Sequence, residues 1–335
     1  MEALVSGMNG TIRKVSVTGP IGKTVVCEYG VIENTGGKTE EKTAVIEIAK
    51  AAGLTLLSEE ERNPLYTTTY GVGEVIKDAV RNGCRKFIVG IGGSATNDGG
   101  AGMLQALGFG LLKENGEQIP IGARGLEELA EITDDNVIPE LAECKFKIAC
   151  DVTNVLCGET GASAVYGPQK GADEEMTERL DRLLFSYASL VKKKIPKADS
   201  MYPGTGAAGG LGFAFLTFMD AQLESGIQIV IKETGLEQEI AKADLVITGE
   251  GRMDGQTAMG KAPIGIAKIA KKYGKPVIAF AGAAARDAGA CNEQGIDAFF
   301  PILREAVSLE AAMKRENAEA NMEAAVEQAY RLCRL

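Results

Sequence analysis

The stretch at residues 87–108, which reads FIVGIGGSATNDGGAGMLQALG, constrains the fold of this chain more than any other. An apolar run at its start predicts a buried strand, and five glycines follow over residues 92–102. The helical spacing of Met103, Leu104 and Leu107 then predicts a helix. A strand, a glycine-rich polar loop and a helix form the usual ligand-binding corner of an α/β protein. Glycines let the backbone approach a ligand closely, and a helix N-terminus favours an anion.

The C-terminal third of the chain alternates clearly between strand-like and helix-like patterns. This alternation predicts an α/β fold with a parallel sheet and helices on both faces. The β-rich start and the polar middle differ in texture from the alternating parts, so we expect two domains interleaved in sequence, residues 66–110 plus 205–335 and residues 1–65 plus 111–204. Strands are expected at 12–17, 24–29, 44–48, 87–91, 145–150, 245–248, 277–281 and 298–302, turns at 18–20 and 34–37, and helices at 72–82, near 126–131, at 173–194, from about 213 to 223, and at 261–272, 287–294 and 308–334.

Composition excludes several classes of function. A net charge of −10 argues against a broad nucleic-acid-binding surface. The chain has no histidine, so acid–base chemistry falls to carboxylates, lysine, tyrosine or cysteine. No run is long and apolar enough to predict a membrane span. The 7 cysteines form no CxxC pair and indicate reduced thiols in a cytoplasmic protein.

Four polar, glycine-containing segments follow predicted strands, at 92–100, 151–158, 249–261 and 281–285. Because parallel sheets bind ligands at the carboxyl ends of their strands, these four loops could converge on one cleft. In the first loop, the N–H groups of Gly92, Gly93 and Ser94 could cradle phosphate oxygens, with the Ser94 and Thr96 hydroxyls as further donors. Asp98 could act as a base or hold a magnesium ion, and the alternative is that it caps the following helix.

The second and third loops carry the remaining carboxylates. Asp151 directly follows a strand and suits magnesium, or it forms an Asx-turn that ends the strand. The third loop contains Glu250, Arg252, Asp254 and Lys261. Its last seven residues read G-x-x-x-x-G-K as in a P-loop, but alanine follows where that motif needs Ser or Thr, so the match is incomplete.

Two further segments are open to more than one interpretation. Lys261 opens a predicted helix, where it could meet a phosphate or remain a solvated surface charge. Lys170, in a polar turn, is most simply a surface charge but could reach a substrate carboxylate. The glycines of 206–212 permit close helix packing or a hinge, and packing is the preferred interpretation.

Three long motifs carry a resemblance to a known family. They are GIGGSATNDGGAGMLQALG, DVTNVLCGETGASAVYGPQKGA and TGEGRMDGQTAMGKAP. In this order and spacing they resemble the bacterial, type I glycerate kinase family over the whole chain. The resemblance implies ATP- and Mg²⁺-dependent phosphorylation of D-glycerate, giving 2-phosphoglycerate, by two α/β domains with the active site in the cleft between them. One domain would be Rossmann-like (66–110 plus 205–335) and the other a smaller mixed α/β domain.

Family members begin with an APDSFKGS-like segment and an ADGGEGT-like loop. This chain starts after both, so we expect it to lack segments that would line the cleft in the family. The hypothesis that joins the motifs places ATP phosphates at the first loop and at Gly249 and Gly251. Asp151 or Glu250 would hold Mg²⁺, Asp98 or Asp254 would accept the glycerate hydroxyl proton, and Arg252 or Lys261 would neutralise developing charge. The rival functions are a ligand-binding protein without catalysis and a kinase of another small hydroxy acid.

Overall fold

The computed structural model describes residues 1–33 and 41–333. Contacts between residues divide the chain into two units, Met1–Ile229 and Val230–Leu335. Among the described residues, no helix combines the length and the apolar character needed to cross a membrane. The turn expected at 34–37 lies outside the described residues.

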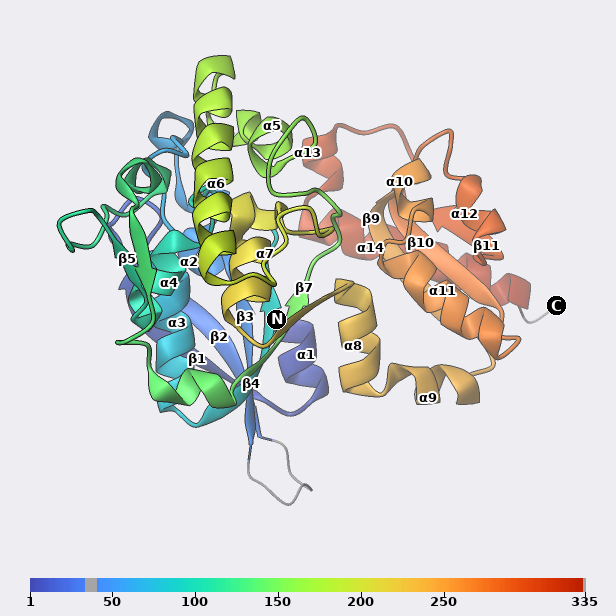
Figure 1. The fold of residues 1–335 in the computed structure, drawn as a ribbon. Coiled ribbons are helices and arrows are strands. Elements are labelled where there is room, and N and C mark those ends of the chain that lie inside the picture. The colour runs from blue at the N-terminus through green and yellow to red at the C-terminus, as the bar shows by residue number, and fades with distance from the viewer. Residues whose placement is uncertain (34–40, 334–335) are drawn as a thin grey trace. The chain divides into compact units, whose positions relative to one another are not determined.

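A six-stranded sheet with the order β1-β2-β3-β4-β7-β8 organises the first unit (Figure 1). Its first three strands pair antiparallel, and its last four run parallel, so β3 belongs to both halves. The carboxyl ends of the parallel strands therefore share one edge, where α/β proteins bind their ligands. The strands are β1 (Thr11–Thr18), β2 (Thr24–Glu33), β3 (Lys42–Glu47), β4 (Cys84–Gly90), β7 (Lys145–Ala149) and β8 (Ala221–Glu224), with a separate antiparallel pair β5 (Gly110–Leu112) and β6 (Glu131–Thr133).

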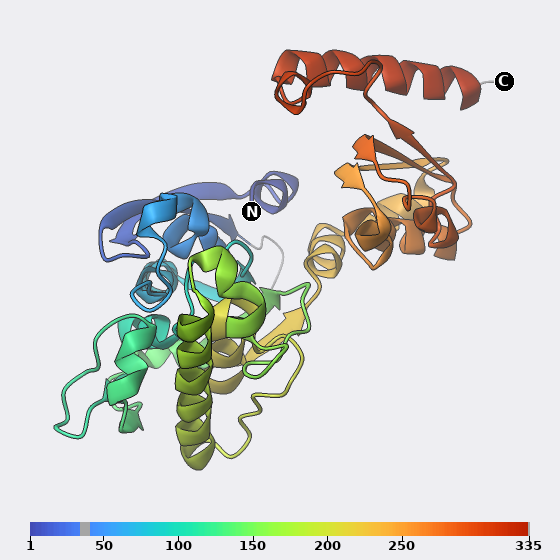
Figure 2. The same cartoon turned by 90° about the horizontal axis from the view of Figure 1, so that it is seen from above.

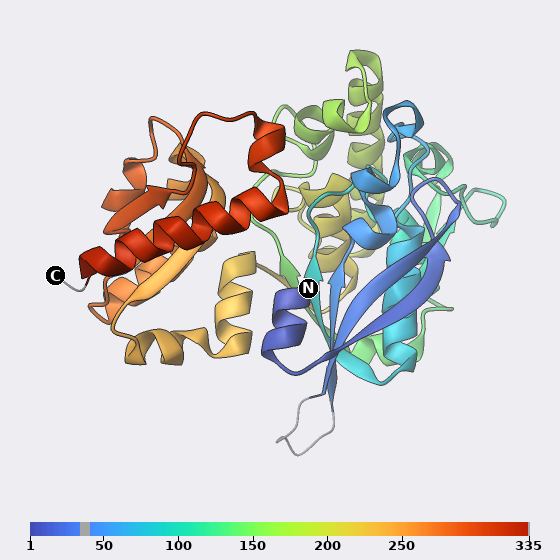
Figure 3. The ribbon, with the colours of Figure 1, turned by 180° about the vertical axis from the view of Figure 1, so that it is seen from behind.

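Helices cover both faces of this sheet. Leu4 and Val5 of α1 are buried, and Figure 3 shows α1 beside the β1–β2 ribbon. The main core joins the sheet to α3, α4, α6 and α7, and Phe87 stacks on Phe146 with ring centroids 4.6 Å apart. The helices and 3-10 turns are α1 (Glu2–Gly7), α2 (Ala49–Ala52), η1 (Leu54–Leu56), η2 (Glu59–Glu61), α3 (Tyr70–Arg81), α4 (Ala101–Leu107), η3 (Ala123–Glu128), η4 (Pro139–Glu143), α5 (Ala162–Tyr166), η5 (Pro168–Lys170), α6 (Glu174–Lys194) and α7 (Ala207–Phe218).

The second unit is a three-layer α/β/α arrangement around a parallel sheet with the order β11-β10-β9. Ile264 of α11 lies in one core with Val277, whereas Phe280 on the same strand packs with Ala329 of α14 on the other face (Figure 2). The elements are α8 (Gly226–Thr234), which spans the division between the units, α9 (Leu236–Lys242), β9 (Val246–Met253), α10 (Gly255–Ala258), α11 (Ala262–Lys272), β10 (Val277–Ala284), α12 (Ala290–Glu293), β11 (Ala298–Pro301), α13 (Leu309–Ala312) and α14 (Arg315–Cys333).

The predicted alternation is confirmed, and several element bounds differ. The apolar helix α7 ends at Phe218 rather than near 223, because Met219 is extended and residues 221–224 pair with β7 as an edge strand. The helix expected near 126–131 is a 3-10 turn followed by β6. The long C-terminal helix breaks into α13 and α14.

The observed division into units also differs from the interleaved one expected from the sequence. Strand β4 lies between β3 and β7, so residues 42–47, 84–90 and 145–149 share a single sheet. The hydrogen-bonded ladder thus joins segments that the sequence texture assigned to two domains, and the units follow each other along the chain.

Candidate active site

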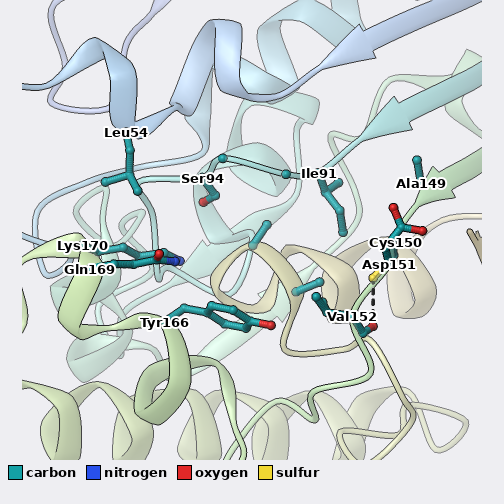
Figure 4. Close-up of a pocket in the computed structure, with 14 residues that line it drawn as sticks. Leu54, Ile91, Ser94, Ala149, Cys150, Asp151, Val152, Tyr166, Gln169 and Lys170 are labelled. Atoms are coloured by element: carbon teal, nitrogen blue, oxygen red, sulfur yellow. Dashed lines mark hydrogen bonds between the residues drawn. The ribbon is translucent and has the colours of Figure 1, made fainter. Parts of the chain in front are cut away.

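A cavity of about 350 Å³ opens where β4 and β7 end (Figure 4). It brings together the first and second predicted loops and adds two segments from farther along the chain. Its lining includes Leu54, Ile91, Gly92, Gly93 and Ser94, then Ala149, Cys150, Asp151 and Val152, then Tyr166, Gln169 and Lys170, and finally Ala207 and Ala208.

The loop after β4 presents unused backbone donors to this cavity. The N–H groups of Gly92, Gly93 and Ser94 have no hydrogen-bond acceptor among the residues that the structure describes. Gly93 has φ +72°, a conformation that glycine adopts without strain. Neighbouring free N–H groups next to a cavity form an anion-binding arrangement. Thr96 does not line the cavity as expected: it is fully buried, and its hydroxyl lies 2.9 Å from the Ser94 hydroxyl.

Asp98 lies inside the protein rather than in the cavity. It is 0% exposed, and Oδ2 accepts bonds from the Thr69 N–H at 2.8 Å and the Thr69 hydroxyl at 2.9 Å. The N–H groups of Gly100 and Gly102 donate to it at 3.2 and 3.3 Å. Burial raises the pKa of the Asp98 carboxyl, and these donors oppose that shift. The position does not suit a base that meets substrate. Asp98 instead ties the first turn of α4, through the Gly102 N–H, to the start of α3, although the N-cap residue of α4 is Gly100 rather than Asp98.

Asp151 occupies the cavity wall as predicted. It follows β7 directly, and Oδ1 accepts bonds from the Ser225 hydroxyl at 2.9 Å and the Gly226 N–H at 3.1 Å. Oδ2 accepts no hydrogen bond from the described residues. Ser225 follows β8, the neighbouring strand, so the adjacent parallel strands β7 and β8 orient this carboxylate at their shared edge. One oxygen is held by the protein, and the other is available to a ligand.

Lys170 is buried, although the sequence favoured a surface position for it. It is 2% exposed, and its ammonium donates a 2.6 Å hydrogen bond to the Thr96 carbonyl. Gly171 follows with φ +93°, and a Cβ there would meet the Arg62 carbonyl oxygen at 2.4 Å. This close approach presses the η5 turn against the segment around Arg62 and directs the lysine inward. Burial lowers the pKa of Lys170 to about 7, although the charge of Asp98 opposes that shift.

The third predicted loop lies in the second unit and begins later than expected. Strand β9 continues through Met253, because its pairing with β10 extends to Arg252 and Met253. Gly249 and Gly251 therefore lie within an edge strand rather than in a phosphate-binding loop. The irregular segment starts at Asp254, whose carboxylate caps the short α10 by accepting from the N–H groups of Gln256 and Thr257.

The charged residues of the third predicted loop lie close to one another. Glu250 accepts a 3.1 Å bond from the Thr257 hydroxyl, and its other oxygen lies 3.6 Å from the ammonium nitrogen of Lys261. The Arg252 Nε lies 3.8 Å from Asp254. Lys261 occupies the N-cap of α11, as predicted, and its side chain is partly exposed. The fourth loop, expected at 281–285, starts only at Ala285, since β10 runs to Ala284.

The start of α7 contributes the other feature that the sequence did not reveal. Ala208 has φ 52°, one of two non-glycine residues with positive φ among the described residues, and it lines the cavity. The following glycines pack against the first loop: a Cβ on Gly209 would lie 2.0 Å from the Thr96 carbonyl oxygen. The preferred packing interpretation of 206–212 is consistent with this contact. The spacing of the glycines in the sequence indicated this packing, whereas nothing in the sequence indicated the positive φ of Ala208.

A family model described as "Glycerate kinase family" matches residues 1–334. The chain belongs to the glycerate kinase family. A "Glycerate kinase" of Halalkalibacterium halodurans is 47% identical over 315 residues, which cover 94% of this chain and 81% of the relative. "Glycerate 2-kinase" of Escherichia coli K12 is 46% identical, with the same coverage of both chains.

A solved structure agrees with this assignment. The crystal structure of a Salmonella typhimurium LT2 protein assigned as glycerate kinase 2 matches with a TM-score of 0.85 and 46% identity. The match covers 99% of this chain and 85% of that one. The resemblance carried by the three sequence motifs is therefore confirmed, and so is the α/β fold class.

Proposed function

We propose that this glycerate kinase family member transfers the γ-phosphoryl group of ATP to D-glycerate and forms 2-phosphoglycerate. The observation that carries the proposal is the match of residues 1–334 to the family, with relatives at 46–47% identity over 94% of the chain. The name of the Escherichia coli relative supports the 2-hydroxyl as acceptor. The lack of histidine is compatible with this reaction, because phosphoryl transfer depends on positioning and charge stabilisation more than on a special nucleophile.

The cavity in the first unit supplies the elements that such a reaction needs. The free N–H groups of Gly92, Gly93 and Ser94 would bind phosphate oxygens. Tyr166 and Gln169 line the same cavity (Figure 4), where the Gln169 amide would hydrogen-bond a small hydroxy acid and the Tyr166 hydroxyl, which donates to Asn154 Oδ1 at 2.6 Å, could accept a hydrogen bond from it.

The residues present also fit a magnesium ion. Among the described residues no group of three or more metal-ligating side chains occurs, and Mg²⁺ bound with a nucleotide needs only one or two carboxylates besides phosphate oxygens and water. Asp151 provides such a carboxylate, with Oδ2 unengaged. We assign Asp151 as the Mg²⁺ ligand in preference to Glu250, whose two oxygens already contact Thr257 and Lys261. When bound, the ion would neutralise charge on the phosphates.

We propose that the second unit supplies the group that accepts the glycerate hydroxyl proton and the cations that bind phosphate. Because Asp98 is buried, Asp254 is the better of the two predicted acceptors for the glycerate proton, although its carboxylate also caps α10. Arg252 and Lys261 remain candidates for phosphate binding. Asp254→Asn and Lys261→Met, each compared with Lys268→Met on α11, test these roles through kcat. Unchanged kcat in both would remove the second unit's segment from the mechanism.

The experiment that tests the function is an ADP-release assay with a panel of small hydroxy acids. We expect turnover with D-glycerate, dependent on ATP and Mg²⁺. Turnover of another hydroxy acid alone would reassign the substrate, and calorimetric ATP binding without turnover of any acid would favour a binding protein.

A cytoplasmic location accords with the six cysteines that the structure describes as free thiols.

A further inference from the structure

The ammonium group of Lys170 lies in the protein interior, where its positive charge and its N–H donors are only partly matched by acceptors. Its one hydrogen-bond acceptor among the described residues is the Thr96 carbonyl, at 2.6 Å. None of the described carboxylates lies within 4.0 Å of it, the limit for an ion pair. An ammonium carries three N–H donors, and burying a charge without a counter-charge is unfavourable.

The surroundings of Lys170 show where the missing partner would lie. The lysine lines the same cavity as Gly92, Gly93 and Ser94, whose N–H groups also lack acceptors. In Figure 4 the Lys170 side chain extends into the cavity beside Gln169, in the direction of Ser94. Asp98, whose charge raises the Lys170 pKa, already accepts hydrogen bonds from Thr69, Gly100 and Gly102. The unsatisfied groups of Lys170, Gly92, Gly93 and Ser94 are therefore all donors, and this part of the cavity lining is complementary to an anion.

We propose that Lys170 is a substrate-binding residue whose ammonium pairs with an oxyanion of the bound ligand, either the carboxylate of glycerate or a phosphate of ATP. This inference rests on the proposed function for the identity of the ligands, but the complementarity to an oxyanion does not. The Thr96 carbonyl then orients the ammonium, and the ligand supplies the charge that the protein omits. Before binding, the buried ammonium is a source of instability that the ligand relieves.

The test compares Lys170→Met and Lys170→Gln with a control lysine substitution at an exposed position, Lys192→Met. Lys192 also donates to a backbone carbonyl, that of Ala198 at 2.5 Å, but it does not line this cavity. Calorimetry on the full chain measures D-glycerate, Mg-ATP and inorganic phosphate separately, and thermal melts report folding. We expect the control to bind as the wild type does. The Lys170 variants should bind at least one of these anions roughly 10- to 100-fold more weakly, which is typical for loss of a charge-assisted hydrogen bond.

Each outcome decides the proposal. Weaker binding of D-glycerate alone assigns the carboxylate as partner, and weaker binding of Mg-ATP alone assigns a phosphate. Unchanged binding of all three anions overturns the proposal. A large drop in melting temperature in both Lys170 variants, with the control folded, also overturns it, because the Thr96 contact would then explain the buried lysine. If the wild type does not phosphorylate glycerate, the proposed function fails, while the inorganic phosphate measurement still tests Lys170.

Discussion

The ammonium nitrogen of Lys170 donates a 2.6 Å hydrogen bond to the carbonyl oxygen of Thr96, joining the η5 turn to the glycine-rich loop after β4. The two residues are 74 positions apart in sequence. Thr96 is fully buried and Lys170 is 2% exposed. This contact connects the second of the three sequence motifs to the first, and Lys170 itself lines the candidate active site.

The stability of the protein should depend on pH through Lys170. The lysine pKa is about 7 in the folded protein and near its ordinary 10.5 in the unfolded chain. Below pH 7 the lysine is protonated in both states, and the full penalty of burying its charge applies. Between pH 7 and 10.5 the unfolded chain binds more protons, so stability rises as pH rises.

We therefore expect the free energy of unfolding of the wild type, minus that of Lys170→Met, to increase from pH 7 to pH 10 in urea titrations. Taking the difference removes contributions shared by both proteins, such as those of the buried cysteines. The charge of Asp98 raises the Lys170 pKa and so opposes the lowering caused by burial. A flat difference would show that Lys170 keeps an ordinary pKa.

Asp98→Ala should mainly lower the free energy of unfolding, because Asp98 has a structural role and does not take part in the reaction. The substitution leaves the donors of Thr69, Gly100 and Gly102 unsatisfied in the interior, and breaking such a buried charged contact is strongly destabilising, by about 3 kcal/mol. Urea unfolding measures the loss, with the exposed Asp135→Ala as control. Asp98→Asn that folds normally but has lost more than about 100-fold in kcat would instead support the base role.

The fold and part of the site were predictable because their causes are local. Alternating apolar runs and glycine loops gave the strand–loop–helix unit, and the placement of Asp151 after a strand followed from the β7 pattern. The burial of Lys170 and Asp98 was not predictable from the sequence, because it depends on partners far along the chain. Likewise, the turn signals at 249–251 suggested a loop, but pairing with β10 keeps those glycines in the strand. Sequence patterns show polarity, whereas tertiary contacts decide which polar groups face a cavity.

Gly209→Ala should destabilise the protein by more than its backbone strain alone. Its φ is +67°, and the added Cβ would lie 2.0 Å from the Thr96 carbonyl oxygen. Gly116→Ala is the matched control, because its φ of +83° carries similar strain with no atom within 4 Å of a Cβ. We expect a loss of about 1 kcal/mol in the control and at least about 3 kcal/mol for Gly209→Ala by urea unfolding. Equal losses would contradict the packing role of this segment.

Asp151→Asn should weaken the use of Mg²⁺. The amide keeps an oxygen that can accept from Ser225 and Gly226 but removes the negative charge offered to the ion. We expect the Mg²⁺ concentration at half-maximal rate to rise about 10-fold or more, with the melting temperature little changed. Asp135→Asn serves as control. An unchanged Mg²⁺ dependence would remove Asp151 from the ligand set.

Phosphorylation of D-glycerate on its 2-hydroxyl by this chain is tested most directly by ³¹P NMR of the reaction with ATP and Mg²⁺. A phosphate on carbon 2 couples to one methine proton, so the product signal should be a doublet that grows with ADP. A triplet, from a phosphate on the carbon 3 methylene group, would contradict the assigned position. The absence of any new phosphate ester, with the protein folded and ATP intact, would contradict the proposed function itself.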